Sequence, residues 1–322
     1  MKGAIDMAVY LHDFTFLSAE TEYAMLELEK RTCFNTYYPF HLFPDKGVKR
    51  IEFGPITIFY GGNGSGKSTM LNIIATKLGV LRELPFQPTQ FFDWYVNGVT
   101  RRVYGDPRYD YVDTDVHVDG TSFNSDLPDE LKAVPAESRI LTSEDVFERT
   151  LATRGQNRKI DRLRAELGHK WWEFKIEDKR VNYTSEEGPE RDEWFHQKQM
   201  KKKSMSAVIR DELGLNVPTG SNGENAFEYF CERIQGHALY LLDEPENSLS
   251  AIWQTKLAKL ILGMARFEEC QFVIATHSPF LLGIGGAKIY DLDTPGTPVR
   301  PWTELENVRE YFTFFRDRAG EF

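Results

Sequence analysis

The chain has 322 residues, of which 41% are hydrophobic and 13% aromatic, and it carries a formal net charge of −10. That apolar content excludes a disordered chain, and the negative balance argues against a surface coated uniformly for nucleic acid. No apolar stretch reaches the 18 or so residues that a spanning helix needs, and charges interrupt the apolar runs near the N-terminus, so we expect neither direct membrane insertion nor a signal peptide.

The first part of the chain reads as a strand, a glycine loop and a helix. Ile51 to Tyr60 is apolar and β-branched and then breaks into glycines, which is typical of a buried strand that enters a loop. Lys67 to Leu78 contains good helix formers with apolar residues at helical spacing. We interpret residues 1–97 as the N-terminal part of a nucleotide-binding core.

The middle of the chain has a different character. Residues 98–135 are rich in Asp, Gly, Tyr and Val and predict loops with short strands, whereas 142–213 are mostly charged and predict helices with a break at 185–189. We interpret 98–218 as a region inserted into the core, with loops and short strands followed by charged helices that form a helical subdomain. Residues 149–212 carry 16 Lys and Arg against 12 Asp and Glu, which favours a partner or nucleic-acid surface, with an ordinary solvated face as the alternative.

The C-terminal part, 219–322, returns to the core. Ala238–Leu242 and Gln271–Ala275 are short, continuously apolar runs, which suits parallel strands covered on both faces. Between them, Ser250 to Phe267 has the pattern of an amphipathic helix, so the three segments predict a β-α-β unit in an α/β fold.

The strongest motif follows the first strand and matches the pattern G-x-x-x-x-G-K-[ST]. Backbone N–H groups of such a loop wrap around phosphates, and the helix that follows adds favourable dipole charge. Lys67 would bridge the β- and γ-phosphates, and the Ser68 hydroxyl would ligate Mg²⁺. A chance glycine-rich turn is the alternative, against which the flanking strand and helix argue. The predicted nucleotide-binding residues are Gly61, Gly62, Asn63, Gly64, Ser65, Gly66, Lys67, Ser68 and Thr69.

Two acids follow the apolar run at 238–242. Asp243, at the end of a buried strand, would hold Mg²⁺, and the adjacent Glu244 would orient and polarise an attacking water. The alternative is a strand end that meets solvent, which the upstream glycine loop makes less attractive.

A histidine follows the apolar run at 271–275. The imidazole of His277 could contact a γ-phosphate oxygen or the attacking water. A lone histidine is more often structural, but its place after a strand that itself follows the acidic pair favours a catalytic role.

A fourth motif, Ser221-Asn222-Gly223-Glu224, opens a segment of helical composition from Asn225 to Arg233. Its simplest interpretation is a capping box, in which Ser and Glu satisfy the first N–H groups of a helix. Such a helix start also presents N–H groups and a positive dipole end to an anion.

These four elements, in this order, resemble the Walker A, signature, Walker B and switch-histidine motifs of the ABC-type ATPases. Residues 221–224 stand where that superfamily has S-G-G-Q, and 248–250 stand where it has the D-loop. More narrowly, SNGE, LLDEPENSLS and IATHSPFLL look like small prokaryotic AAA-family ATP-binding proteins related to the SMC and OLD ATPase heads, with some relatives in antiphage defence systems. The resemblance covers 51–97 and 219–292.

The resemblance implies a P-loop NTPase of ABC-type head architecture, with a mixed sheet, an inserted helical subdomain, and ATP and Mg²⁺ as cofactors. It also implies an ATP-dependent homodimer in which Ser221, Asn222, Gly223 and Glu224 complete the site in trans. For the Q-loop glutamine of this superfamily we choose Gln90, ahead of two phenylalanines, over Gln87. The aromatic that stacks on adenine has no clear counterpart, although Tyr37, Tyr38 and Phe40 lie upstream.

Three functional classes fit these motifs. The leading hypothesis is an ATP-driven switch that regulates a separate effector protein, in line with the antiphage-defence relatives. The second is an SMC-like DNA-maintenance ATPase, although the insert lacks the sustained heptads of a long coiled coil. The third is the ATPase subunit of a membrane transporter. Three cysteines without metal-like spacing favour a reduced, cytoplasmic location.

Overall fold

A computed structural model describes residues 7–31, 33–103, 134–176, 204, 206–207 and 221–322. The chain divides into two compact units, the first formed by residues 1–146 and 222–322 and the second by residues 147–221. The predicted loops between 104 and 133, the predicted break at 185–189 and the Lys201–Lys203 run lie outside the described residues. The expected insert boundaries, 98 and 218, stay a prediction.

The first unit is built on a five-stranded sheet in which every neighbouring pair is parallel. Its strand order is β5-β6-β7-β3-β8. The strands are β3 (Ile56–Tyr60), β5 (Arg139–Thr142), β6 (Leu239–Asp243), β7 (Gln271–Ala275) and β8 (Lys288–Asp291). Both strands predicted from the C-terminal part of the sequence are confirmed, β6 shifted by one residue. Because all five strands run the same way, their carboxyl ends meet at one edge.

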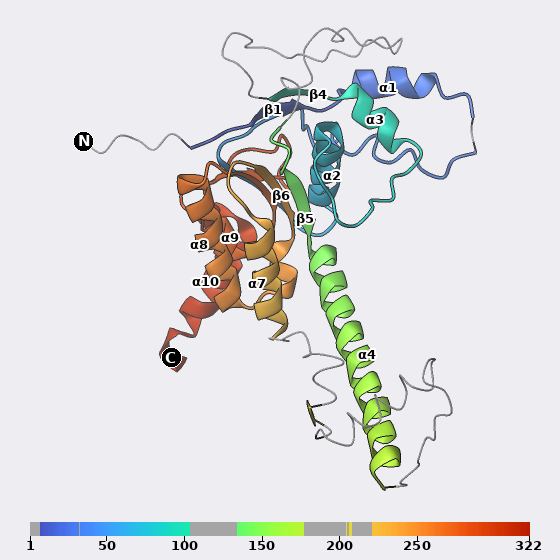
Figure 1. Cartoon of the computed structure of the whole chain (residues 1–322). Coiled ribbons are helices and arrows are strands. Elements are labelled where there is room, and N and C mark those ends of the chain that lie inside the picture. The colour runs from blue at the N-terminus through green and yellow to red at the C-terminus, as the bar shows by residue number, and fades with distance from the viewer. Residues whose placement is uncertain (1–6, 32, 104–133, 177–203, 205, 208–220) are drawn as a thin grey trace. The chain divides into compact units, whose positions relative to one another are not determined.

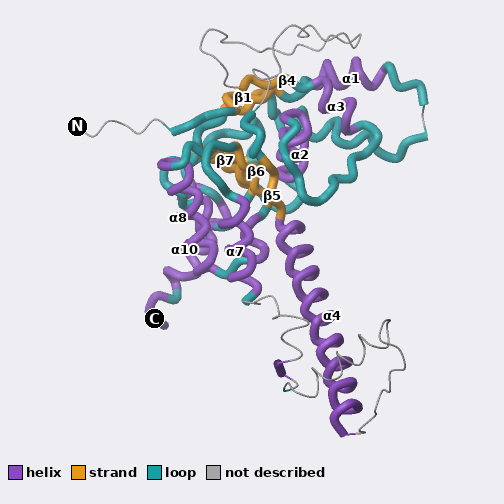
Figure 2. Tube along the Cα trace, in the orientation of Figure 1, coloured by secondary structure: helices purple, strands orange, loops and turns teal. Residues whose placement is uncertain are grey.

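A second, antiparallel sheet lies beside the first (Figure 2). It consists of β1 (Leu11–Thr15), β2 (Arg50–Glu52) and β4 (Thr100–Val103), in the order β2-β1-β4. The sequence predicts one strand over 51–60, and this is wrong: β2 and β3 belong to different sheets. Pro55 has no backbone N–H to donate to a neighbouring strand, and it restricts the backbone of Gly54 before it. Strand pairing therefore stops between β2 and β3. Parallel and antiparallel strands are therefore both present.

The helices predicted from apolar periodicity are present, whereas α1, α3, α9 and α10 were not predicted. The helix predicted over 67–78 is α2, and Ser250 is the N-cap of α8. The α-helices are α1 (Ala19–Glu27), α2 (Lys67–Leu78), α3 (Phe92–Gly98), α4 (Ser143–Ile176), α7 (Asn222–Arg233), α8 (Ala251–Phe267), α9 (Pro279–Leu282) and α10 (Glu306–Asp317). Short 3-10 helices cover η2 (Pro245–Ser248), η3 (Trp302–Glu304) and η4 (Ala319–Glu321).

The parallel sheet is apolar on both faces because helices cover both. Along β3, Phe59 faces one buried cluster with α2, whereas Ile58 and Tyr60 face a second cluster with α7 and α8. Figure 1 shows α2 on one side of the sheet and α7, α8 and α10 on the other. The same alternation in β6 and β7 explains why these strands read as continuous apolar runs. None of the described helices combines the length and the apolar composition that crossing a membrane requires.

Candidate functional site

The glycine loop joins β3 to α2 at the carboxyl edge of the parallel sheet. Gly64 and Gly66 adopt φ values of 79° and 95°, which side chains rarely tolerate. A Cβ on Gly61 would lie 2.6 Å from the Ser65 hydroxyl oxygen, so this position also has no room for one. The loop closes on Lys67, whose buried Nζ donates to the carbonyls of Gly61 at 2.8 Å and Gly62 at 3.0 Å.

The candidate Mg²⁺ ligands come together from two elements. Ser68, in the first turn of α2, donates its hydroxyl hydrogen to Asp243 Oδ1 at the end of β6 over 2.9 Å. Burial is the main reason that the pKa of Asp243 is raised from 3.8 to about 6. A hydroxyl and a carboxylate are oxygen ligands that suit Mg²⁺. Because Mg²⁺ keeps several waters and binds substrate phosphates, two protein oxygens are a fitting set.

Glu244 is held in a strained backbone conformation next to these ligands. Its φ of 46° and ψ of 50° are left-handed, which costs a non-glycine residue about 1–3 kcal/mol. Its N–H donates to the carbonyl of Ala275 at 2.9 Å, which fixes the turn against β7. One carboxylate oxygen lies 3.6 Å from Lys67 Nζ, and the other accepts from Asn247 at 3.0 Å. The strain therefore serves to aim a carboxylate at the glycine loop.

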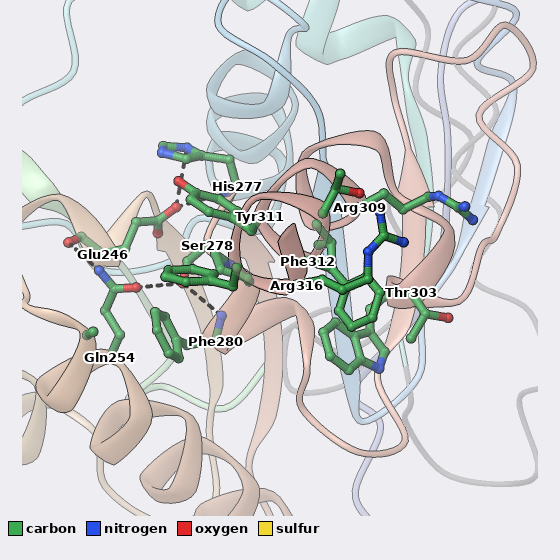
Figure 3. A pocket seen from close by; sticks show the side chains of 16 residues that line it. Glu246, Gln254, His277, Ser278, Phe280, Thr303, Arg309, Tyr311, Phe312 and Arg316 are labelled. Atoms are coloured by element: carbon green, nitrogen blue, oxygen red, sulfur yellow. Dashed lines mark hydrogen bonds and ion pairs between the residues drawn. The ribbon is translucent and has the colours of Figure 1, made fainter. Parts of the chain in front are cut away.

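Glu246 organises the switch segment, and the sequence analysis missed it. Its carboxylate is buried, and Oε1 accepts from the Thr276 hydroxyl at 2.6 Å and from the His277 N–H at 2.9 Å. The Nδ1 atom of His277 lies 3.4 Å from the same oxygen (Figure 3). Asn307 donates to the His277 carbonyl at 3.1 Å. The only sequence signal was a third carboxylate two residues after Glu244.

A cavity of about 510 Å³ opens beside Ser68, Asp243 and Glu244. Gln87 lines this cavity, whereas Gln90 does not, so the structure brings the glutamine that we did not choose to the carboxylates. Arg82 also lines it and donates to Asn72 Oδ1 at 2.5 Å. Burial is the main cause that lowers the pKa of the Arg82 guanidinium. The sequence analysis did not find Arg82.

A second cavity, of about 420 Å³, lies over the glycine loop. Tyr38 lines it, and its hydroxyl is 2.5 Å from the Thr69 hydroxyl. Of the three upstream aromatic residues, Tyr38 is thus the one that reaches the loop; Phe40 is buried in the core. Asp293, which follows β8, accepts from the Gly62 N–H at 2.8 Å and was also not predicted.

The fourth motif begins α7, as its capping-box pattern predicts. A Cβ on Gly223 would lie 2.8 Å from Cδ1 of Trp253 in α8, so α7 packs tightly on α8 at this point. Asn222, Gly223 and Glu224 are not among the described residues that line the two cavities at the glycine loop.

Comparison with known proteins gives one family match. Residues 214–283 match a family model described as "AAA domain, putative AbiEii toxin, Type IV TA system". The chain carries a domain of this ABC-type ATPase family. The matched segment includes Asp243, Glu244, Glu246 and His277, together with residues 221–224. No curated protein matches the chain.

Several solved structures are similar to this chain. One is a Smc head domain from Pyrococcus furiosus, with an extended coiled coil and bound to the C-terminal domain of ScpA. It is 15% identical to this chain, with a TM-score of 0.42, and the match covers 83% of this chain and 95% of that one. An SMC head domain from Thermotoga maritima is 12% identical with a TM-score of 0.34, covering 91% and 99%.

Proposed function

We propose that this ABC-type ATPase hydrolyses ATP as a molecular switch, and that two copies close around ATP to control a partner protein. The observation that carries the proposal is the meeting of Lys67, Ser68, Asp243 and Glu244 at the carboxyl edge of the parallel sheet. A phosphate-binding lysine, two oxygen ligands for Mg²⁺ and a carboxylate base are the parts that phosphoryl transfer to water requires.

Lys67 supplies the charge for phosphate binding. Its Nζ is satisfied by two loop carbonyls, and these are weak partners that phosphate oxygens can replace. Ser68 and Asp243 would hold Mg²⁺, which when bound neutralises charge on the phosphates. Tyr38 lines the cavity over the loop, where it would contact the bound nucleotide.

Glu244 would act as the general base that orients the attacking water and takes its proton. Asn247 and the backbone contact to Ala275 hold this carboxylate, so it needs little reorganisation. His277 would contact the γ-phosphate or the water, with Glu246 fixing its backbone. Gln87 and Arg82 line the cavity at the carboxylates, and we propose that both sense the bound nucleotide there.

The signature would act from a second copy. Residues 222–224 do not line the phosphate cavities of their own chain, whereas the N-terminus of α7 offers N–H groups and a positive dipole end to an anion. Ser221, Asn222, Gly223 and Glu224 of one copy would therefore cover the γ-phosphate held by the other. ATP then joins the copies, and hydrolysis by Glu244 releases them.

The partner would be a separate effector protein. The matched family model names a toxin and a Type IV TA system, which supports an effector in antiphage defence as the partner. A second candidate function is SMC-like DNA maintenance. The observation that favours it is α4, on which Arg158, Lys159 and Arg162 are exposed; salt-dependent DNA affinity would support it.

The proposal is tested by phosphate release from ATP with Mg²⁺. Lys67→Ala should lower turnover by at least about a hundredfold, because the loop then lacks its cation. Lys259→Ala, which removes an exposed lysine of α8, should leave turnover unchanged. A folded Lys67→Ala protein with wild-type turnover would overturn the P-loop assignment.

A further inference from the structure

A cavity of about 800 Å³ lies between α10 and the switch segment, and five aromatic side chains line part of it (Figure 3). Phe280 and Trp302 line it together with Tyr311, Phe312 and Phe315 of α10. These rings are exposed, up to 65% for Phe312. Soluble proteins rarely leave so many large apolar side chains together in water without a use for them. We call this cavity the α10 groove.

Charges are sorted between the two faces of α10. Arg309 and Arg316 line the groove, whereas the acidic residues Glu306, Glu310 and Asp317 do not. Spacings of three, four and seven residues place Arg309, Phe312 and Arg316 on one helix face. The described residues offer Arg309 no ion pair. Arg316 already pairs with Asp317 over 3.0 Å, and its guanidinium lies 5.8 Å from the centre of the Phe312 ring. The groove thus combines apolar walls with a cationic rim.

The floor of the groove is the switch segment itself. Glu246, His277 and Ser278 line it beside Gln254. Ser278 donates to Gln254 Oε1 at 2.7 Å, and Gln254 donates in turn to the carbonyl of Leu249, in the segment that resembles the D-loop, at 2.8 Å. Within the described part of the chain, the Glu246 Oε2 and His277 Nδ1 atoms are buried without a hydrogen-bond partner. An occupant of the groove would therefore touch residues that set the position of His277.

We propose that the α10 groove binds a segment of a partner protein, with apolar side chains between the aromatic rings and a carboxylate against Arg309. Trp, Tyr and Arg are the residues that dominate binding energy at protein interfaces, and all three line this groove. An apolar segment flanked by acidic residues complements both the walls and the rim.

Single-stranded nucleic acid is the other occupant that stacks on aromatic rings, but it needs a cationic track for its backbone. Residues 302–322 carry five acidic residues and only three arginines. This balance opposes a polyanion that lies along α10, whereas a peptide can place one or two carboxylates at the rim alone. A peptide is therefore the occupant that the charges favour.

The expected effect on ATP turnover rests on the proposed function, because an occupant that moves His277 would change the rate of hydrolysis. Binding itself needs no nucleotide, so it is measured separately. A library of random twelve-residue peptides is selected on the full chain without nucleotide. Enriched peptides should carry an aromatic or leucine anchor beside Asp or Glu.

Matched variants decide where the enriched peptides bind. Phe312→Ser and Arg309→Glu should each raise their Kd by about tenfold or more. Phe314→Ser and Arg318→Glu change the same residue types on and just after α10 but outside the groove, so they should leave the Kd within about twofold. Circular dichroism checks that all four variants fold, as expected for exposed side chains.

Three outcomes would overturn the proposal. The selection could enrich no peptide, or the enriched peptides could bind all four variants with equal affinity. In the third outcome, a twelve-residue oligothymidine binds the wild type but not Phe312→Ser, which would assign the groove to nucleic acid. A bound peptide should also change wild-type ATP turnover by at least about twofold. If the wild type hydrolyses no ATP, the proposed function fails, while the binding result for the groove still stands.

Discussion

Ser68 Oγ donates a 2.9 Å hydrogen bond to Asp243 Oδ1, which joins the first turn of α2 to the end of β6 across 175 positions of sequence. The parallel sheet brings these residues together, because β3, which leads into the glycine loop and α2, and β6, which ends at Asp243, run to the same edge. Mg²⁺ ligation at this pair would tie the glycine loop to the strand that carries the proposed base. Nucleotide binding and the position of Glu244 would thereby be coupled.

The first prediction concerns pH. The pKa of Asp243 in the folded protein, about 6, lies above its ordinary value of 3.8, so the folded protein binds more protons between these values. Stability contributed by this group therefore falls as pH rises from about 4 to about 6, and above pH 6 the buried charge costs up to about 3 kcal/mol. At pH 7.5 without Mg²⁺, Asp243→Asn should raise the free energy of unfolding, measured by denaturant titration.

Mg²⁺ should instead favour the stability of the wild type over that of Asp243→Asn, since it binds the ionised carboxylate. Mg²⁺ with ADP should raise the melting temperature of the wild type at pH 7.5, less so at pH 5.5, and hardly at all in Asp243→Asn. Asp93→Asn, at an exposed position of α3, serves as the control. An equal Mg²⁺ response in wild type and Asp243→Asn would remove Asp243 from the metal site.

The second prediction separates two glutamines that lie three residues apart. Gln87 lines the cavity at Asp243 and Glu244, and Gln90 does not. Gln87→Ala should therefore lower kcat for ATP hydrolysis by about tenfold or more, as expected for a residue that positions water or Mg²⁺. Gln90→Ala should leave kcat within about twofold. The reverse pattern in a steady-state assay would restore the choice made from sequence.

These glutamines also show where sequence reasoning stops. The motifs that follow strands, at Lys67, Asp243 and His277, could be found because an apolar run marks each position. Residues 83–89 contain no strand or helix, so no periodicity tells which glutamine points inward. Glu246 is a similar case: its neighbours in the chain do not reveal a buried carboxylate, because its partners Thr276 and His277 are about 30 positions away.

Strand prediction failed at 51–60 for a related reason. Both β2 and β3 are apolar or β-branched, so composition alone makes them look continuous. The change of sheet depends on Gly54 and Pro55, whose effect becomes clear only when Phe53 is seen to donate to the carbonyl of His12, outside the parallel sheet. Local propensity predicted the elements, whereas tertiary pairing decided which sheet each one joined.

The third prediction concerns Glu246. Glu246→Ala would leave the buried Thr276 hydroxyl and the His277 N–H without their acceptor, at about 1–3 kcal/mol for each group. Glu246→Gln keeps an acceptor oxygen, so its free energy of unfolding should fall by less than half as much as that of Glu246→Ala. Denaturant titration measures both, with Glu310→Ala at an exposed position of α10 as the control. Equal stability of the alanine and glutamine variants would show that these hydrogen bonds do not hold the segment.

The last prediction tests the composite site. Glu244→Gln keeps the shape of the side chain but removes the base, so ATP should bind and persist. Light scattering with Mg²⁺-ATP should then report twice the monomer mass, and the mass should return to that of the monomer when nucleotide is removed. Wild type should show the dimer only briefly, because hydrolysis releases it.

Adding a substitution in the signature distinguishes a trans site from simple ATP retention. Ser221→Arg places a bulky side chain where the opposite γ-phosphate would lie, so the double variant should bind ATP as a monomer. Ser206→Arg, at an exposed serine of the same compact unit, should leave the Glu244→Gln dimer intact. If the mass of Glu244→Gln never responds to ATP although a filter assay shows that ATP is bound, hydrolysis proceeds without dimer closure and the signature has another use. An oligomer that forms without nucleotide would instead place the contact elsewhere on the chain, since ATP would then not be what joins the copies.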